Sequence, residues 1–159
     1  MATTLTAATM TVTVAENITL NGKEQGSANT KTFASINEIS KRIVTVTTTE
    51  AEILKFHATD VDAGRYIIGD VRYMRFTNLD DTNFITLTFT NEDDDEVAIK
   101  LDAGHSFIFG ADNTLGLVDV MNAVTAGNAA SDTALADVTS VQADANTASC
   151  DLEVFVASV

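Results

Sequence analysis

Most of the chain consists of short segments in which apolar and polar side chains alternate, the pattern of a β-strand with one buried face. In residues 9–14, Met10, Val12 and Val14 point to one side and three threonines to the other. Such segments recur every 8–12 residues or so, with turn residues between them. The pattern predicts strands at 9–14, 42–49, 51–57, 71–77, 84–90, 97–101, 105–109, 138–143 and 151–157.

Two of these segments, 71–77 and 84–90, are separated by the turn-forming run NLDDTN, which predicts that they pair as a hairpin. Residues 51–57 also fit a helical turn, and 115–124 fit either one or two helical turns or an irregular strand. Residues 126–137 are rich in small and polar residues and predict a long loop. The expected fold is therefore all-β: a single antiparallel β-sandwich of jelly-roll type with little helix.

Residues 1–20 are expected to form an N-terminal extended arm or first strand, and residues 30–159 the sandwich body of the same single domain. Met10, Val12 and Val14 are candidate interface residues, because an extended strand on an Ala/Thr-rich lead can add to the sheet edge of a neighbouring subunit. The alternative is an ordinary first strand of the chain's own sandwich.

Composition restricts the partners of this fold. The chain has 24 threonines, no proline and a formal net charge of −14. So acidic a chain lacks the basic surface that nucleic acids or anionic membranes require. No apolar run is long enough to span a membrane, the N-terminus lacks the features of a secretory signal, and the single Cys150 excludes an intrachain disulfide.

Carboxylates gather in two predicted turns, and they are the candidates for a metal site. Asp80 and Asp81 lie in the first turn, and Asp93, Asp94 and Asp95 lie in the second. Calcium requires several converging oxygens, but these runs lack the alternating spacing and the glycine of an EF-hand loop. We favour solvated acidic turns, and expect neither a metal nor a cofactor.

Arg72 and Arg75 are the remaining interface candidates. The alternating pattern places Arg72 on the same face as Met74 and Phe76, which predicts partial burial or an interface. Each arginine could form an ordinary salt bridge with one of the many carboxylates, or contribute to a positive patch that docks on an acidic neighbour.

Catalytic chemistry is not readable in the sequence. The chain has two histidines, His57 and His105, and no G-x-S-x-G, H-E-x-x-H, P-loop or dinucleotide-binding motif. Cys150 begins an apolar strand, where a buried inert thiol is common. A pair of acids could serve glycoside hydrolysis, but a chain without tryptophan offers few aromatics to line a sugar cleft. We expect no enzymatic activity.

Four segments carry a resemblance to a known class: TLTAATMTVTVAENITLNG at 4–22, VRYMRFTNLDDTNFITLTF at 71–89, VAIKLDAGHSFIF at 97–109 and CDLEVFVAS at 150–158. The chain resembles the small, acidic, Thr-rich β-sandwich structural proteins of tailed-bacteriophage virions, especially marine ones.

The resemblance implies a capsid decoration (cement) protein that is assembled in the host cytoplasm and located in the virion. It would bind the major capsid protein or another virion protein and associate with itself, for example as a trimer. The alternatives are a tail, adaptor or fibre-attachment protein, and a receptor- or glycan-binding module. No site residue is implied by the resemblance.

Overall fold

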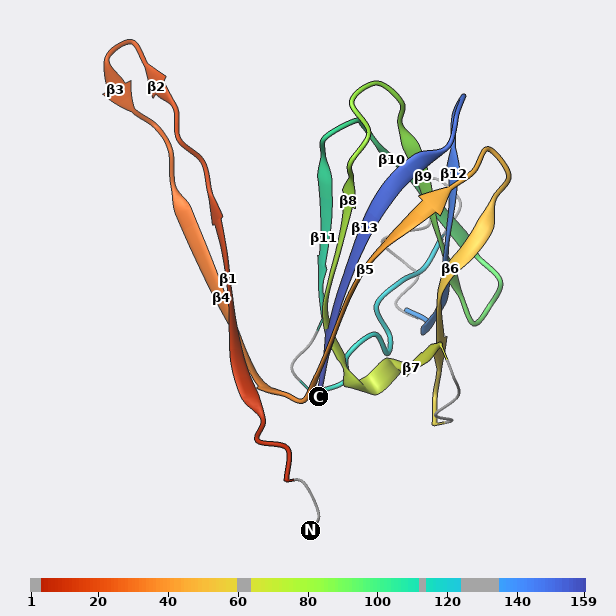
Figure 1. Cartoon of the computed structure of the whole chain (residues 1–159). Coiled ribbons are helices and arrows are strands. Elements are labelled where there is room, and N and C mark those ends of the chain that lie inside the picture. Colours follow the sequence, from red (N-terminus) through yellow and green to blue (C-terminus); the bar gives the residue numbers. More distant parts are fainter. Residues whose placement is uncertain (1–3, 60–63, 112–113, 124–134) are drawn as a thin grey trace.

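The structure is a computed structural model that describes residues 4–59, 64–111, 114–123 and 135–159. It is all-β, with a two-sheet body and a hairpin arm (Figure 1). The arm strands are β1 (Ala8–Ala15), β2 (Thr19–Leu20), β3 (Lys23–Glu24) and β4 (Ala28–Ile36). The body strands are β5 (Glu38–Val46), β6 (Ala51–His57), β7 (Arg65–Ile67), β8 (Val71–Asn78), β9 (Ile85–Asn91), β10 (Glu96–Leu101), β11 (Ser106–Gly110), β12 (Val138–Ala145) and β13 (Cys150–Ser158).

The body strands form two sheets, in the orders β11-β8-β13-β5 and β10-β9-β12-β6-β7. Apart from the short parallel strand β7, which pairs with β6, all neighbours are antiparallel. Of the connections between consecutive long strands, β9–β10 stays within one sheet and the others cross between sheets. This order is the double Greek key of an eight-stranded jelly roll, and it confirms the predicted fold class.

The predicted hairpin between residues 71–77 and 84–90 is wrong. Both segments are strands, but β8 pairs with β11 and β13, whereas β9 pairs with β10 and β12 in the opposite sheet. The connection bends around the buried side chain of Asn78, whose Nδ2 donates to the carbonyls of Asn83 (2.8 Å) and Leu101 (3.2 Å). Alternation reports that a strand has a buried face, and it does not report the sheet to which the strand belongs.

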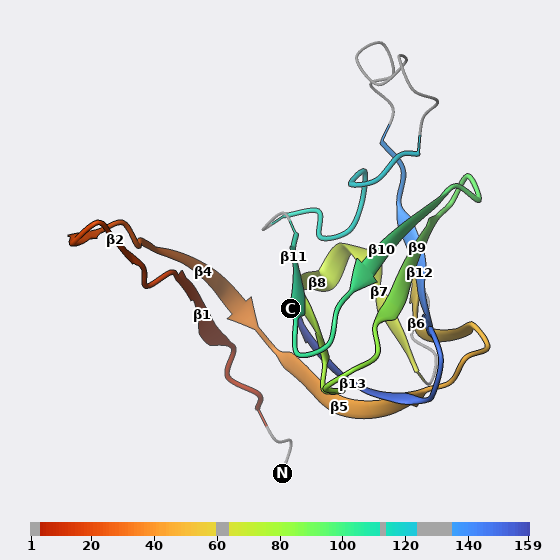
Figure 2. The same ribbon diagram turned by 90° about the horizontal axis from the view of Figure 1, so that it is seen from above.

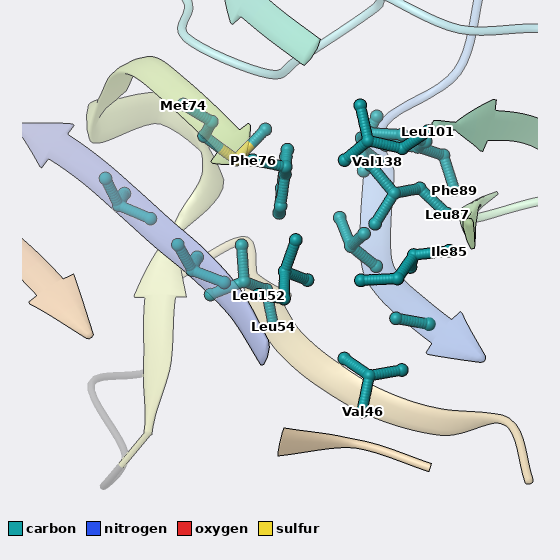
Figure 3. Packing of buried hydrophobic residues seen from close by; sticks show 14 of the residues in the cluster. Val46, Leu54, Met74, Phe76, Ile85, Leu87, Phe89, Leu101, Val138 and Leu152 are labelled. Carbon is teal, nitrogen blue, oxygen red and sulfur yellow. The ribbon is translucent and has the colours of Figure 1, made fainter. Parts of the chain in front are cut away.

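The core lies between the two sheets and consists of the inward side chains of every long body strand (Figure 3). Met74, Phe76 and Leu152 of one sheet face Leu87 and Phe89 of the other, and Phe76 and Phe89 meet edge to face with centroids 5.9 Å apart. The predicted inward orientation of Ile85, Leu87 and Phe89 is confirmed. Burial of these side chains supplies the main favourable term for folding.

The arm is a hairpin in which β1 pairs antiparallel with β4, and it diverges from the body (Figures 1 and 2). It is longer than the predicted arm of residues 1–20, because strand 28–36 belongs to the hairpin and not to the predicted body of residues 30–159. Asn37 alone separates β4 from the first body strand. Residues 21–31 are polar and have no alternating apolar face, so the sequence did not predict that the chain returns along β1. The partner of a strand depends on pairing with residues that are distant in the sequence.

The tip of the arm is fixed by polar contacts around Glu24. Its carboxylate accepts hydrogen bonds from the backbone N–H groups of Gly26 (2.8 Å) and Ile18 (3.3 Å), which hold its pKa below the ordinary value. A Cβ at Gly26 would lie only 1.9 Å from the carbonyl oxygen of Glu16, so the close approach of the two strands requires glycine. The arm is therefore a defined structural element up to its tip.

Residues 115–121 form neither the predicted helical turns nor a strand. They make irregular turns that end in an isolated bridge between Met121 and Ala136. The predicted loop at 126–137 lies largely outside the described residues. The helix of the described part of the chain is the 3-10 turn η1 (Ile68–Asp70), which is too short to cross a membrane.

Replacing a core leucine should destabilise the body far more than replacing an exposed one. Leu87 is 0% exposed, and Leu79 in the β8–β9 connection is 47% exposed. We expect Leu87→Ala to lower the free energy of unfolding by about 2–5 kcal/mol, because it leaves a cavity between the sheets. Leu79→Ala should change it by less than about 0.5 kcal/mol. Urea denaturation followed by circular dichroism measures both, and equal effects would contradict this description of the core.

Candidate functional site

The outward face of the β11-β8-β13-β5 sheet is unusually apolar for a surface that the body does not cover. Cross-strand pairing arranges its side chains in rows, each row containing one residue from each strand. The rows are Ile39, Ala157, Tyr73 and Gly110; Lys41, Phe155, Arg75 and Ile108; and Ile43, Glu153, Thr77 and Ser106. We call this surface the arm-side face.

The outward face of the other sheet is polar. Its rows contain Lys100, Thr86 and Asp144; Ala98, Thr88, Gln142 and Glu52; and Glu96, Thr90, Ser140 and Lys55. Solvated sheet faces normally have this composition. The two sides of the sandwich therefore differ, and the apolar side is the one over which the arm extends (Figure 2).

The arm also has two different faces. Residues that pair directly across a hairpin share a face, so Met10, Val12 and Val14 lie on the same side as Phe33 and Lys31. The opposite side carries threonines, among which the Oγ1 atoms of Thr13 and Thr30 are 3.0 Å apart. The apolar side of the arm is turned toward the arm-side face, because Met10 and Val12 pack against a buried cluster that includes Tyr73 and Ala157 of that face.

A second, smaller apolar cluster anchors the base of the arm on the sheet. It contains Phe33, Ile36, Tyr73 and Ala157, all buried. The Phe33 ring lies 5.9 Å from that of Tyr73. Burial raises the pKa of the Tyr73 phenol.

Phe33 and Ile36 would point to opposite sides of a regular strand, because they are three residues apart. A bulge on β4, opposite Ala8–Met10 of β1, turns both toward the body. Ser35, inside the bulge, has φ +62°, in the left-handed region that non-glycine residues rarely occupy. Both side chains of this strand can thereby anchor the arm.

Beyond this anchor, the arm and the sheet enclose a groove, which we call the arm groove. One part, of about 400 Å³, lies among Val12, Val14, Lys31, Tyr73 and Ile108. An adjoining part of about 390 Å³ is lined by Met10, Arg75 and Phe155 together with Val12, Tyr73 and Ile108. The walls of the first part are largely apolar, whereas those of the second part are mixed, since Thr11, Thr13 and Arg75 also line it.

Three charged groups beside the arm groove form ion pairs. The carboxylate of Glu153 accepts hydrogen bonds from Lys41 Nζ (2.9 Å) and from the Arg75 guanidinium, which also lies over the Phe155 ring at 5.8 Å from the centroid. Hydrogen bonding to Lys41, with the nearby positive charges, holds the pKa of Glu153 below its ordinary value. Two further charged residues, Glu16 and Lys31 of the arm, also line the groove.

Charge divides the molecule into two parts. The arm through residue 36 contains two lysines, Lys23 and Lys31, and two glutamates, Glu16 and Glu24. The formal charge of −14 is therefore carried by residues 37–159. Two copies of the chain repel through their bodies and not through their arms.

Four of the five interface candidates line the arm groove: Met10, Val12, Val14 and Arg75. For Arg75 the salt-bridge alternative is confirmed. Arg72 lies apart, since it is buried and its Nη1 donates to the carbonyl of Gly69 at 2.6 Å. It therefore braces the turn before β8 and forms neither an exposed patch nor, among the contacts of the described residues, a salt bridge.

Tyr73, Ile108 and Phe155 line the arm groove but were not among the candidates. The sequence did contain a feature that marks them: each is an apolar or aromatic residue at a position that the alternating pattern predicts to face outward. That feature is ambiguous without the fold, since an outward position can be covered by another element of the same chain.

The acidic metal candidates are not brought together. Asp80 and Asp81 precede β9, whereas Asp93, Asp94 and Asp95 follow it, so they lie at opposite ends of this strand. Asp80 Oδ1 accepts the N–H groups of Thr82 and Asn83, which hold its pKa below the ordinary value. The described residues contain no group of three or more His, Cys, Asp or Glu arranged to hold a metal ion.

The groups considered for catalysis serve local structure. The Nδ1 of His57 accepts the N–H of Thr59, and the Nδ1 of His105 lies 2.9 Å from the carbonyl oxygen of Ala103. Cys150 is buried between the sheets, and burial together with nearby Asp80 raises the pKa of its thiol. A thiol in this setting stays protonated and is a poor nucleophile.

Comparisons with known proteins give one structural likeness and no family. No family model matches the chain, and no curated protein is similar to it. A similar solved structure is that of a Bacillus endospore appendage, described as a disulfide-linked pilus; it is 14% identical, with a TM-score of 0.45, over 77% of this chain and 85% of that one. A likeness of this size supports no statement about function, which we therefore infer from the arm and the sheet.

The ion-paired Glu153 makes a pH-dependent contribution to stability. Its pKa in the folded state lies below the ordinary value of 4.5, so the ionised carboxylate stabilises the fold at neutral pH. This contribution is lost as the pH falls from 4.5 through the folded-state pKa. We expect Glu153→Gln to be less stable than the native chain at pH 7, with the difference shrinking below pH 4.5 in urea titrations. Glu50→Gln, in an exposed turn, controls for the loss of one negative charge.

Proposed function

We propose that this protein is a non-enzymatic structural component of a virus particle, and that it decorates the head of a tailed bacteriophage. Many copies would bind the major capsid protein on the outer surface of the shell. The resemblance of four sequence segments to phage structural proteins supports this proposal, and so does the jelly-roll body, a fold used by viral capsid domains among others.

The observation that carries the proposal is the difference between the two sides of the sandwich. One side is polar and suited to solvent, and the other presents an apolar sheet face with an arm extended over it. Exposed apolar surfaces of this kind mark interaction sites. An apolar sheet face beside an extended arm therefore supports a role in assembly.

A repetitive shell suits a protein with such a surface. Each contact can be weak, because neighbouring copies on a lattice of identical sites bind cooperatively through multivalency. The net charge of −14 disfavours contacts between the bodies of free copies in solution.

The copy number of the protein in purified particles tests the proposal. Quantitative mass spectrometry of virions from the phage that encodes the chain should give hundreds of copies per particle. About 3, 6 or 12 copies would instead assign it to the tail or to an adaptor, as symmetric tail assemblies require. Its absence from the particle would overturn the proposal.

A charge on the apolar side of the arm should reduce incorporation into particles without unfolding the body. Val12 lines the arm groove, and Thr30 lies on the opposite side of the same hairpin. We expect Val12→Asp particles to contain several-fold fewer copies, because burying a carboxylate in an apolar interface is costly. Thr30→Asp adds the same charge and should be incorporated normally. Equal incorporation of both variants would contradict a role for this face.

A further inference from the structure

We propose that the arm groove is the binding site for the arm of a second copy of this chain. The inference rests on the proposed structural role and names the partner of the surface that carries it. Four observations support it: exposed apolar side chains on both elements, an unprotected strand edge, the distribution of charge, and the direction of the arm.

Large apolar side chains are exposed on both elements. On the arm, Val14 is 45% exposed, and Ile18 and Leu20 at the tip are 54% and 60% exposed. On the arm-side face, Ile108 is 42% exposed. Val14 and Ile108 line the same groove, so a single occupant can cover both, whereas Ile18 and Leu20 lie outside it.

The strand at the mouth of the groove has an unprotected edge. β11 is an edge strand, and its sequence SFIFG contains no charge and no proline. The other long edge strands of the body are protected by charges, β5 by Lys41 and Arg42 and β10 by Glu96 and Lys100. Edge strands without such protection accept a further strand.

The arm has the properties that this site requires of its occupant. It must be extended and apolar on one side, since Val12, Tyr73 and Ile108 form apolar walls of the groove. β1 contains no charged residue, and the charges of the whole arm cancel. An acidic surface of a second body would meet the acidic body of the first, whereas the arm approaches it without repulsion.

A chain cannot place the tip of its arm in its own groove. The buried cluster of Phe33, Ile36, Tyr73 and Ala157 fixes the base, and the hairpin diverges from the body above it (Figures 1 and 2). Ile18 and Leu20 do not line the groove of their own chain. The arm of a second copy can enter, and reciprocal entry closes a dimer, whereas one-way entry continues into a ring or a chain.

The first test is the mass of the purified full-length chain by light scattering at low and high concentration. We expect the native chain to form a dimer or larger species, and Ile108→Lys to be a monomer of 16.9 kDa at the same concentrations. Ala98→Lys is the matched control, since Ala98 is an exposed outward residue of the other sheet's edge strand β10, and it should assemble like the native chain. Circular dichroism establishes that both variants fold. A native chain that is monomeric at every concentration overturns the inference.

The second test identifies the occupant and does not depend on the lysine variant. The photoreactive residue p-benzoylphenylalanine replaces Ile108, and isotopically labelled and unlabelled copies are mixed before irradiation. Cross-linked peptides from residues 8–36 that combine labelled and unlabelled masses are expected. Ile108 also faces the arm of its own chain, so cross-links within single copies are expected in either case. The absence of cross-links between an arm and the groove of another copy would overturn the inference.

The two proposals fail separately. Abundant copies in the virion with no cross-link between arms and grooves would leave the decoration role intact and remove arm exchange. If arms cross-link to the grooves of other copies but the protein is absent from virions, arm exchange stands and the decoration role is removed.

Discussion

The shape of this protein depends on the apolar contact at the base of the arm. Phe33 and Ile36 of β4 reach the sheet together because a bulge at Ser35 interrupts the alternation of the strand. Without the bulge, either Phe33 or Ile36 would point to solvent, and the arm would lose one of its two buried β4 side chains. The direction of the arm, the existence of the arm groove and the exposure of the arm-side face all follow from this contact.

The distribution of charge and the exposed apolar side chains favour contact at the same regions of the molecule. The body carries the whole net negative charge, whereas the charges of the arm cancel. Beside the groove, Lys41 and Arg75 are both ion-paired with Glu153. An acidic protein of this kind is kept apart from its copies over most of its surface. The arm and the arm-side face are the regions where contact costs least, and they are also the regions with exposed apolar side chains.

The acidic turns are explained by the geometry of the connections. Buried asparagines organise both of them: Asn78 supports the connection to β9, and Asn91 Oδ1 accepts the N–H groups of Asp93 and Asp95 in the turn after it. Amide side chains thus satisfy backbone groups that would otherwise need water. The carboxylates of the second turn are left exposed or half-buried at the surface, where they increase the negative charge of the body.

The sequence by itself determined the class of fold, because period-two alternation and regularly spaced turns depend only on local residues. It located the body strands from β8 to β13, their inward residues such as Leu87, and the apolar face of β1. Tertiary structure alone decided that β8 and β9 lie in opposite sheets and that β4 belongs to the arm. Pairing between strands distant in sequence determines each of these, and a pattern within one strand carries no information about its partner.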